Sequence, residues 1–589
     1  MTMIARAASS LIVLVAASGL SGCGDSSPSE DPAAPVIQLV FSPASVSFGE
    51  ARNQSVDLRN AGEMAVGPVG LAALEVKDGA GNAVPGASLS VSPLELATLG
   101  AGATRTLTLT LNVPGTVGAG EYLVALEARI AGQTAATLGT SFSVVAGDGP
   151  VVTALEIGGP SQARQGEVLS YVVSATGDQG ESIQDASIAW RVEPGFAGLV
   201  TADGDFVGYS VGTASIIAEA GTVADTVDVQ VTSRGAPSGS FEVEWNEPIE
   251  SRYTSDHWEY GDVAFTGTWG CRNVAGGKCG NALFVWDIST PDAPVLTDSV
   301  IVDARVVNDV KVRDSGDLAI ITHESSTDGL NGVTLLDLSD PRHPTVITRF
   351  TAPDLASGVH NVWIDGDYAY LVVDGSVATA GLRVLDVSDP ANPQMVGSFY
   401  GGGSFLHDVY VRDGLAFLSH WAAGLIILDV GNGIAGGTPG QPVEVSRIVI
   451  PGYQVHNAWY WPEAGYVFLG DEIGVPGRVL VVDVSELTTP RQVASFTLAG
   501  AAPHNFWIDE TAGIAYFSWY ENGLHAVDVS GRLLGELDKQ ARQVTGIQYD
   551  LGGVCLASAG TCTWAPQAHA GRVFVSDMNS GLWVLRPTF

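Results

Sequence analysis

Four histidines recur at nearly equal intervals in the C-terminal part of the chain, and each is followed by an asparagine or an aspartate. They are His360, His407, His456 and His504, out of ten histidines in the 589-residue sequence. A neutral imidazole can bind a transition metal through one ring nitrogen, and it can equally make a hydrogen bond. If the fold brings the four rings together, they can form a metal centre, a polar ligand pocket or a repeated structural contact.

The histidines are in phase with a second repeat, a strand of alternating apolar residues that ends in an aspartate. One copy is LRVLDVSDPANP at 382–393. Alternating Val and Leu predict a half-buried strand, and the Asp, Ser and Pro that follow predict the turn that ends it. The repeat aspartates are Asp287, Asp337, Asp386, Asp429, Asp483 and Asp528, and Arg586 takes the seventh place.

Each repeat contains a polar pair that opens a strand, a tight turn, a second strand, the aspartate strand and an outer strand. Short strands in repeats of roughly 40 to 50 residues are typical of β-propeller blades. Residues 240–589 resemble the LVIVD-repeat β-propeller family, and this resemblance implies an all-β, seven-bladed propeller. Because the last unit ends soon after its third strand, we predict that residues 240–246 supply its outer strand by pairing with 582–585.

In a propeller the four histidines lie near one mouth of the central channel if their strands are innermost. The following strands return toward that mouth and end in further polar residues. The candidate binding mouth comprises His360, His407, His456, His504, Asn308, His323, Glu324, His420, Asp471 and Glu472. The aromatic residues that follow the histidines are Trp363, Tyr410, Trp459 and Trp507, and Gly261-Asp262 takes the place of the polar pair in the first unit. Since side chains alternate along a strand, the residue after each histidine is expected to face the other way.

Three interpretations of the histidines remain open: a structural hydrogen bond, a transition-metal site and a metal-free polar pocket. A shared metal needs ring nitrogens at about 2.0–2.2 Å from one point, and nitrogens more than about 6 Å apart exclude it. Four converging imidazoles are similar to the iron site of carotenoid-cleavage oxygenases, whose sequence motifs are absent here. We expect the wider arrangement, in which a histidine-rimmed mouth without a tightly bound metal or other cofactor binds a partner.

The N-terminus predicts an exported, lipid-anchored protein. Arg6 precedes an apolar stretch at 11–20 that is too short to span a membrane as a mature helix. The sequence LSGC at 20–23 resembles the lipobox of bacterial lipoproteins. This resemblance implies a signal peptide at 1–22, a lipid on Cys23 and sorting to the bacterial outer membrane; an ordinary secretory signal with an incidental cysteine is the alternative. Residues 23–35 are polar and contain several prolines, which predicts a solvated tether.

Two modules precede the repeats. Residues 36–147 contain alternating stretches such as TLTLTL at 106–111, and they resemble immunoglobulin-like (Ig-like) sandwich modules of bacterial surface proteins. Residues 151–233 resemble the group 2 bacterial Ig-like family, which is related to the stalk domains of intimin and invasin. These resemblances imply two β-sandwich domains that hold the propeller away from the membrane.

Charge and cysteine usage agree with export. The sequence has 27 Lys and Arg against 64 Asp and Glu, and the net charge of −37 disfavours binding to nucleic acid. Besides Cys23 there are four cysteines, and we expect local disulfides between Cys271 and Cys279 and between Cys555 and Cys562. Neither pair has the C-x2-C spacing of a zinc site.

The fold alone does not fix the function, because propellers host enzymes, ligand-binding proteins and scaffolds. The sequence contains no nucleophile elbow, P-loop, GxGxxG, HExxH or EF-hand pattern. We therefore expect a lipid-anchored cell-envelope protein whose propeller binds a protein or a glycan, rather than an enzyme. A metal-dependent enzyme that uses the histidine mouth and a structural envelope component without a small ligand are the alternatives.

Overall fold

The computed structural model is all-β. It describes residues 39–42, 45–48, 53–62, 64–74, 76–78, 84, 87–92, 95–96, 99–100, 102–112, 120–130, 133–144, 152–184, 186–235, 239–272, 279–373, 380–402, 405–450, 452–472, 477–549, 555 and 560–589. Among these residues the helical segments are three 3-10 turns, η1 (Pro353–Leu355), η2 (Pro462–Ala464) and η3 (Leu537–Gln540). Within the same residues, no helix has the length and apolar character needed to cross a membrane. The predicted signal peptide at 1–22, Cys23 and the tether at 23–35 lie outside the described residues.

The chain divides into two compact units. The first takes in the chain up to Gly158 together with Val172–Trp190 and Ile217–Val227. The second takes in Gly159–Tyr171, Arg191–Ile216 and Asp228–Phe589. The segment at 151–233 therefore contributes to both units.

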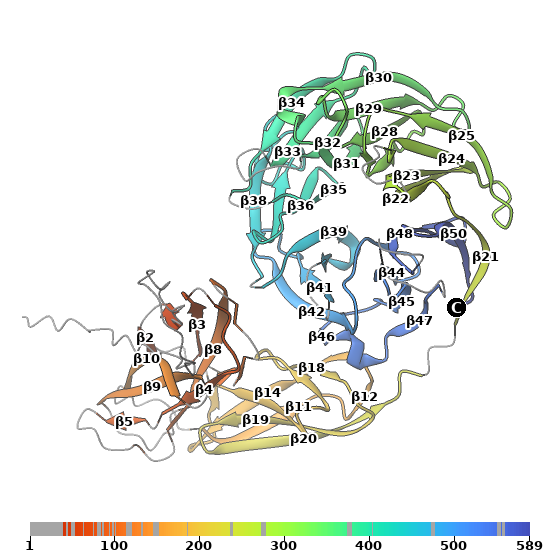
Figure 1. The fold of residues 1–589 in the computed structure, drawn as a ribbon. Helices are drawn as coiled ribbons and strands as arrows, with labels where there is room; N and C mark the ends of the chain where they lie inside the picture. Colours follow the sequence, from red (N-terminus) through yellow and green to blue (C-terminus); the bar gives the residue numbers. More distant parts are fainter. Residues whose placement is uncertain are drawn as a thin grey trace, which may run out of the picture. The chain divides into compact units, whose positions relative to one another are not determined.

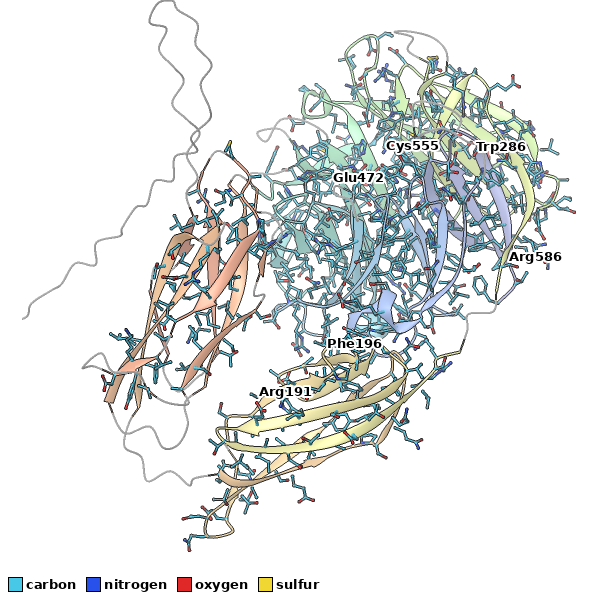
Figure 2. All side chains as sticks on the ribbon, turned by 60° about the horizontal axis from the view of Figure 1, so that its bottom comes forward. Arg191, Phe196, Trp286, Glu472, Cys555 and Arg586 are labelled. Atoms are coloured by element: carbon cyan, nitrogen blue, oxygen red, sulfur yellow. A yellow bond between two sulfur atoms is a disulfide. The ribbon has the colours of Figure 1, made fainter. Side chains whose placement is uncertain are left out.

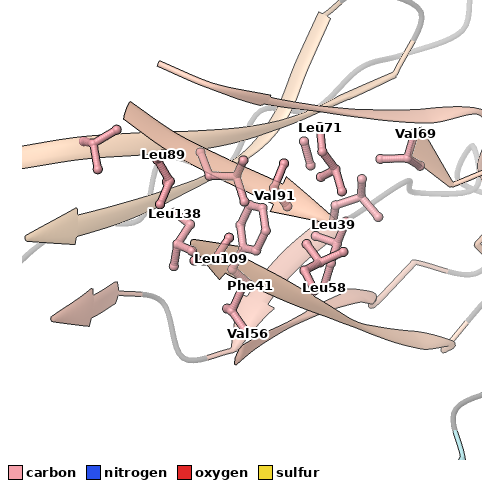
Figure 3. Packing of buried hydrophobic residues seen from close by; sticks show 14 of the residues in the cluster. Leu39, Phe41, Val56, Leu58, Val69, Leu71, Leu89, Val91, Leu109 and Leu138 are labelled. Carbon is pink, nitrogen blue, oxygen red and sulfur yellow. The ribbon is translucent and has the colours of Figure 1, made fainter. Parts of the chain in front are cut away.

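The N-terminal part of the first unit consists of two sheets that share one core. Their strand orders are β1-β3-β8-β6 and β2-β10-β9-β4-β7, with β5 paired to β9. The strands are β1 (Leu39–Ser42), β2 (Ser45–Phe48), β3 (Asn53–Asn60), β4 (Val69–Ala73), β5 (Lys77–Asp78), β6 (Ser88–Ser92), β7 (Glu95–Leu96), β8 (Thr104–Asn112), β9 (Gly120–Ile130) and β10 (Gln133–Val144). Side chains of both sheets meet in this core, including Phe41, Leu58 and Leu71 (Figure 3). In β8 the leucines at 107, 109 and 111 are buried, as the TLTLTL pattern predicts.

Three smaller sheets follow between residues 152 and 232. Their orders are β11-β14-β15, β12-β20-β19-β16 and β13-β18-β17. The strands are β11 (Val152–Gly158), β12 (Gln162–Arg164), β13 (Val168–Ser170), β14 (Val172–Gly177), β15 (Ser182–Ile183), β16 (Ala189–Glu193), β17 (Gly198–Val200), β18 (Asp205–Gly208), β19 (Gly212–Ala220) and β20 (Val223–Thr232).

The described residues from Phe241 to Pro587 form seven sheets, arranged around a common centre (Figure 1). The strands of the first three sheets along the chain are β22 (Arg252–Tyr260), β23 (Val263–Cys271), β24 (Ala282–Asp287), β25 (Val295–Ile301) and β26 (Val306–Val307); β27 (Val310–Val312), β28 (Leu318–His323), β29 (Gly332–Asp337) and β30 (Thr345–Thr351); and β31 (Val359–Asp365), β32 (Tyr368–Val373), β33 (Gly381–Asp386) and β34 (Gln394–Phe399). In the first and third of these sheets the first strands, β22 and β31, lie nearest the centre (Figure 1).

The remaining four sheets repeat this plan. Their strands are β35 (Asp408–Arg412), β36 (Leu415–Ser419), β37 (Leu425–Asp429) and β38 (Val443–Ile448); β39 (Val455–Trp461), β40 (Tyr466–Asp471), β41 (Gly477–Asp483), β42 (Arg491–Leu498) and β46 (Gly535–Glu536); β43 (Phe506–Asp509), β44 (Ile514–Ser518), β45 (Leu524–Asp528) and β47 (Gln543–Ile547); and β48 (Thr563–His569), β49 (Arg572–Asp577), β50 (Gly581–Pro587) and β21 (Phe241–Glu247).

Neighbouring sheets pack face to face. Because side chains alternate along a strand, the two faces of one strand contact two different neighbouring sheets. In β33, Leu382 and Val384 pack with residues of β36 and β37, whereas Leu385 packs with residues of β28 and β29. Both faces of the strand are therefore buried, and the apolar residues run almost without interruption. This packing fixes the inner strands that carry the candidate site.

The last sheet is completed by the first strand of this region. β21 pairs antiparallel with β50, from Phe241 opposite Pro587 to Glu247 opposite Leu582. Figure 2 labels Arg586, the β50 residue that lies opposite Glu242. The predicted pairing of 240–246 with 582–585 is confirmed. The two ends of this region are thus held together by a hydrogen-bonded ladder.

The repeat aspartates close the turn after each third strand. Each accepts a hydrogen bond from the backbone N–H two residues ahead. The donors are Ser289, Ser339, Ser388, Gly431, Ser485 and Ser530, for Asp287, Asp337, Asp386, Asp429, Asp483 and Asp528 respectively. The turn chemistry expected from the sequence is therefore confirmed.

Both expected disulfides are present. Cys271 is bonded to Cys279 and Cys555 to Cys562, with Cα–Cα distances of 5.2 and 4.8 Å. Each bond closes a short loop next to an inner or second strand of this region.

Candidate functional site

Six aromatic side chains form a closed ring at the centre of the seven sheets. They are His360, His407, His456, His504, Trp564 and Trp269, and they are named the histidine layer below. The ring centroids of successive histidines are 4.6, 4.1 and 4.4 Å apart. Trp564 lies 3.8 Å from His504 and 5.4 Å from Trp269, which lies 6.2 Å from His360. Successive histidines are therefore in contact, and the expectation that neighbouring rings are kept apart is wrong.

β-bulges explain why His360 and His456 face the centre. The pairing register of β31 shifts between Val359 and Asn361, and that of β39 shifts between Val455 and Ala458. A bulge adds one residue to a strand and re-aims its side chain. His360 and the Asn361 that follows it consequently both reach the centre of the ring of sheets. The expectation that the residue after each histidine faces away is wrong, because Asn361, Asp408, Asn457 and Asn505 all line the central chamber, and at His360 and His456 a bulge is the reason.

Hydrogen bonds to neighbouring groups fix the tautomers of three histidines. His407 Nδ1 donates to the carbonyl oxygen of His456 at 3.1 Å, and His504 Nδ1 donates to the carbonyl oxygen of Trp564 at 2.8 Å. His360 Nδ1 pairs with Glu324 Oε1 at 2.7 Å. With the proton on Nδ1, the Nε2 atom carries the lone pair.

His456 differs from the other three histidines. Its side chain is buried, and within the described residues neither ring nitrogen makes a hydrogen bond of good geometry; the Asn457 side chain is an adjacent polar contact. Its Nε2 atom lies 3.7 Å from Oε2 of Glu472, whose other oxygen accepts the Tyr520 hydroxyl at 2.6 Å. One ligand atom each from His407, His456 and Glu472 lie within 4.8 Å of one another.

Burial keeps three histidines of the layer neutral. Burial and the neighbouring imidazoles hold the pKa of His407 well below its usual value, and burial lowers the pKa of His456 and His504 to about 3. All three rings are therefore uncharged at neutral pH, and a lone pair is available on each.

Other residues of the predicted mouth have different surroundings. Asn308 Nδ2 donates to the carbonyl oxygen of His360 at 3.0 Å and so supports the histidine layer. His323 is buried and its Nε2 pairs with the Thr334 hydroxyl at 2.9 Å on the adjacent strand. His420 packs beside Gly401 and interacts with its own backbone. Asp471 Oδ1 accepts the backbone N–H of Gln454 at 3.2 Å.

A polar layer follows the histidine layer by one residue along the inner strands. It surrounds a chamber of about 60 Å³, which has room for a few water molecules. The polar side chains that line the chamber are Asp256, His257, Asp309, Asn361, Asp408, Asn457, Asn505, Lys311 and Gln567. Lys311 Nζ contacts Asp309 and lies 3.5 Å from Asp256. Burial raises the pKa of Asp309 to about 6 and that of Asp408 to about 7.

An aromatic layer lies two residues further along the same strands, about 10 Å from the histidine layer at the usual rise of a strand. Its five members form a second closed ring, with centroid separations of 4.5–6.0 Å. They are Trp258, Trp363, Tyr410, Trp459 and Trp507. The layer opens into a depression of about 410 Å³ whose lining also includes Arg412, Asp509 and Glu510.

Sequence reasoning missed Trp258. Gly261-Asp262 was taken as the polar pair of the first repeat, but β22 extends from Arg252 to Tyr260 and is the inner strand of that sheet. The signal was present, because Asp256 and Trp258 have the spacing of Asp408 and Tyr410. The same spacing relates Asp309 to Lys311, so that a lysine takes an aromatic position in the second repeat.

One family comparison agrees with this geometry. Residues 358–400 match the model of the LVIVD repeat. The match covers β31 to β34, so one LVIVD repeat corresponds to one complete sheet with its histidine, aromatic and aspartate positions. No curated protein matches the sequence.

Proposed function

We propose that residues 240–589 form a seven-bladed β-propeller. The seven consecutive sheets, the LVIVD repeat in one of them and the pairing of β21 with β50 support this proposal. In propellers, a strand from one end of the chain often has to complete the last blade, because an open edge would be exposed to further pairing. The central layers then line the propeller axis.

The proposal extends to the segments before the propeller. Residues 36–147 and 151–233 are two Ig-like sandwich domains, and the shared core of the two N-terminal sheets supports the first assignment. Cys23 carries a lipid that anchors the chain in the cell envelope, at the bacterial outer membrane. The two domains act as spacers between this anchor and the propeller.

The function proposed for the propeller is the binding of a neutral glycan at the aromatic layer. The observation that carries this proposal is the closed ring of five aromatic side chains that opens into a depression of about 410 Å³. This volume lies in the range of small-ligand sites, about 300–1,000 Å³. Indole and phenol rings offer flat apolar faces, onto which the C–H faces of sugar rings stack.

Polar groups at the rim of the depression suit the hydroxyl groups of a sugar. Arg412 donates to Glu510 at 2.6 Å, and Asp509 lies beside them in the lining. The carboxylates of the polar layer and the net charge of −37 disfavour an anionic ligand. A protein partner needs a larger contact area, of at least about 1,000 Å² in total.

A panel of neutral and acidic oligosaccharides tests this function with the purified full-length chain, by tryptophan fluorescence and calorimetry. Trp363→Ala and Trp507→Ala are expected to weaken binding of a neutral oligosaccharide at least about tenfold each, because truncating an aromatic anchor typically costs 1.4 kcal/mol or more. Trp190→Ala is the matched control, since Trp190 lies in β16, outside the aromatic layer. Binding that both variants retain, or no binding at all, would contradict the proposal.

A further inference from the structure

The histidine layer contains a buried polar group whose environment is incomplete. Both nitrogens of His456 are shielded from solvent, and in the described part of the chain neither makes a hydrogen bond of good geometry; the polar groups next to the ring are the Asn457 side chain and Glu472 Oε2 at 3.7 Å. Leaving a buried polar group unsatisfied usually costs about 1–3 kcal/mol, so such groups are rare unless a ligand completes them. His456 therefore points to a ligand that accepts the lone pair of an imidazole.

The groups beside His456 have the chemistry of metal ligands. We propose that Nε2 of His407, a ring nitrogen of His456 and Oε2 of Glu472 bind one divalent transition-metal ion of the zinc class. One possible ligand atom from each of the three residues lies within 4.8 Å of the other two. Bonds of about 2.0–2.1 Å in tetrahedral geometry require donors about 3.3 Å apart, so the side chains need to move by roughly 1 Å.

Outer hydrogen bonds already orient the donors. His407 donates its Nδ1 proton to the carbonyl oxygen of His456, which directs its Nε2 lone pair away from that bond. Glu472 uses Oε1 to accept the Tyr520 hydroxyl at 2.6 Å, while Oε2 faces His456 Nε2 at 3.7 Å. Metal-binding histidines and carboxylates in proteins are usually held by such second partners. The side chain of Glu472 (Figure 2) is 24% exposed, which leaves a path for the ion.

The donor set selects the class of ion. Two imidazoles and one carboxylate suit Zn²⁺ and similar ions, whereas Ca²⁺ and Mg²⁺ prefer oxygen ligands. Three protein ligands leave at least one coordination position open to water or to a substrate group, as in catalytic zinc sites.

The test uses the purified full-length chain after removal of metal by a chelator. Calorimetric titration with Zn²⁺ is expected to give one site per chain, and Co²⁺ is expected to give visible ligand-field absorption typical of nitrogen and oxygen ligands. His456→Gln and Glu472→Gln are each expected to weaken binding by more than about 100-fold, and Tyr520→Phe by about 10–100-fold.

Two controls separate this site from surface binding. His343→Gln removes an exposed histidine, and Glu486→Gln removes an exposed carboxylate; both are expected to bind Zn²⁺ as the unchanged chain does. A rise in the melting temperature of the unchanged chain with Zn²⁺ gives a readout that does not depend on the variants folding. No Zn²⁺ binding by the unchanged chain, or equal losses in His343→Gln and His456→Gln, would overturn the proposal. Trp363→Ala leaves the metal site intact, so failure of glycan binding and failure of metal binding are distinguishable.

Discussion

Arg412 Nη1 donates to Glu510 Oε1 at 2.6 Å, and the same oxygen accepts the indole N–H of Trp459 at 2.9 Å. Arg412 ends β35, Trp459 lies in β39, and Glu510 follows β43. These three strands are the inner strands of three consecutive sheets. One carboxylate oxygen therefore ties three sheets together at the rim of the aromatic layer.

Two variants of Glu510 distinguish the contribution of its negative charge from that of its hydrogen-bond acceptor. Glu510→Gln keeps an oxygen for Trp459 and loses the ion pair, so the free energy of unfolding is expected to fall by less than about 1 kcal/mol. Glu510→Ala leaves both Arg412 and the Trp459 indole without this acceptor, and a fall of about 1–2 kcal/mol is expected. Urea unfolding of both variants measures the difference, with Glu486→Gln as the exposed control. Equal losses in the two Glu510 variants would contradict this account.

Asp429 is expected to make stability depend on pH. Its carboxylate accepts backbone N–H groups of Gly431, Gly433, Ala435 and Gly437 at 2.9, 3.1, 2.7 and 3.1 Å. Burial acts to raise the pKa of Asp429, but the four donors more than offset it and hold the pKa below its usual value. The stabilisation is thus complete above the unfolded pKa of about 3.9 and is lost as pH falls through the lower folded pKa.

The difference in free energy of unfolding between the unchanged chain and Asp429→Asn is expected to decrease as the pH is lowered. Asp429→Asn should lower the free energy of unfolding by about 1–2 kcal/mol at pH near 7, because an amide cannot accept from four donors as a carboxylate does. Below the folded pKa the variant and the unchanged chain should become similar. Asp337→Asn at the same repeat position is the matched control, and a smaller loss is expected there. Urea unfolding across this pH range measures both, and a constant difference would argue against the assignment.

Much of the fold could be predicted because its determinants are local. The alternating strand before Asp386 and the turn after it are encoded within twelve residues. The alternating segment that forms β21 could be recognised as the outer strand that the last sheet needs beside β50. The site was predicted less well. The bulges that turn His360 and His456 toward the centre depend on pairing with the next strand, so strict alternation gave the wrong side-chain direction. Glu472 was named, but its position beside His456 depends on how neighbouring sheets pack.

Lipidation at Cys23 is testable in cells. Replacing Cys23 with Ser removes the thiol that would carry the lipid, so the chain is expected to leave the membrane fraction and to lose labelling by a fatty-acid analogue. Cys271→Ser is a suitable control, because its thiol is joined to Cys279 and is not available for acylation. Membrane association that persists in Cys23→Ser would rule out this anchor.

The disulfides are expected to add stability without determining the fold. Removing a crosslink that closes a loop of eight residues, as between Cys271 and Cys279, should cost about 2–3 kcal/mol in the chain-entropy account. The double variant with serine at both positions should therefore remain folded and melt at a lower temperature. Thermal unfolding with and without reductant measures the effect. Loss of the folded state at room temperature would mean that the bond does more than restrict the unfolded chain.

The closing strand β21 offers two neighbouring positions with opposite environments. Trp245 packs edge-on against Trp286 at a centroid distance of 5.4 Å, and it lies against a cluster that includes Phe574 and Leu582. Val243 is 49% exposed. Trp245→Ala should therefore lower the free energy of unfolding by about 2–3 kcal/mol, somewhat less than a fully buried tryptophan would.

Val243→Ala should change stability by less than about 0.5 kcal/mol, as is usual for exposed positions. Because β21 joins the first and last parts of this region, loosening it should also expose the edge of β50. Limited proteolysis is expected to cut Trp245→Ala near residues 241–250 sooner than Val243→Ala. If both variants resist cleavage equally and unfold at the same urea concentration, the pairing of β21 with β50 is not what holds the two ends together.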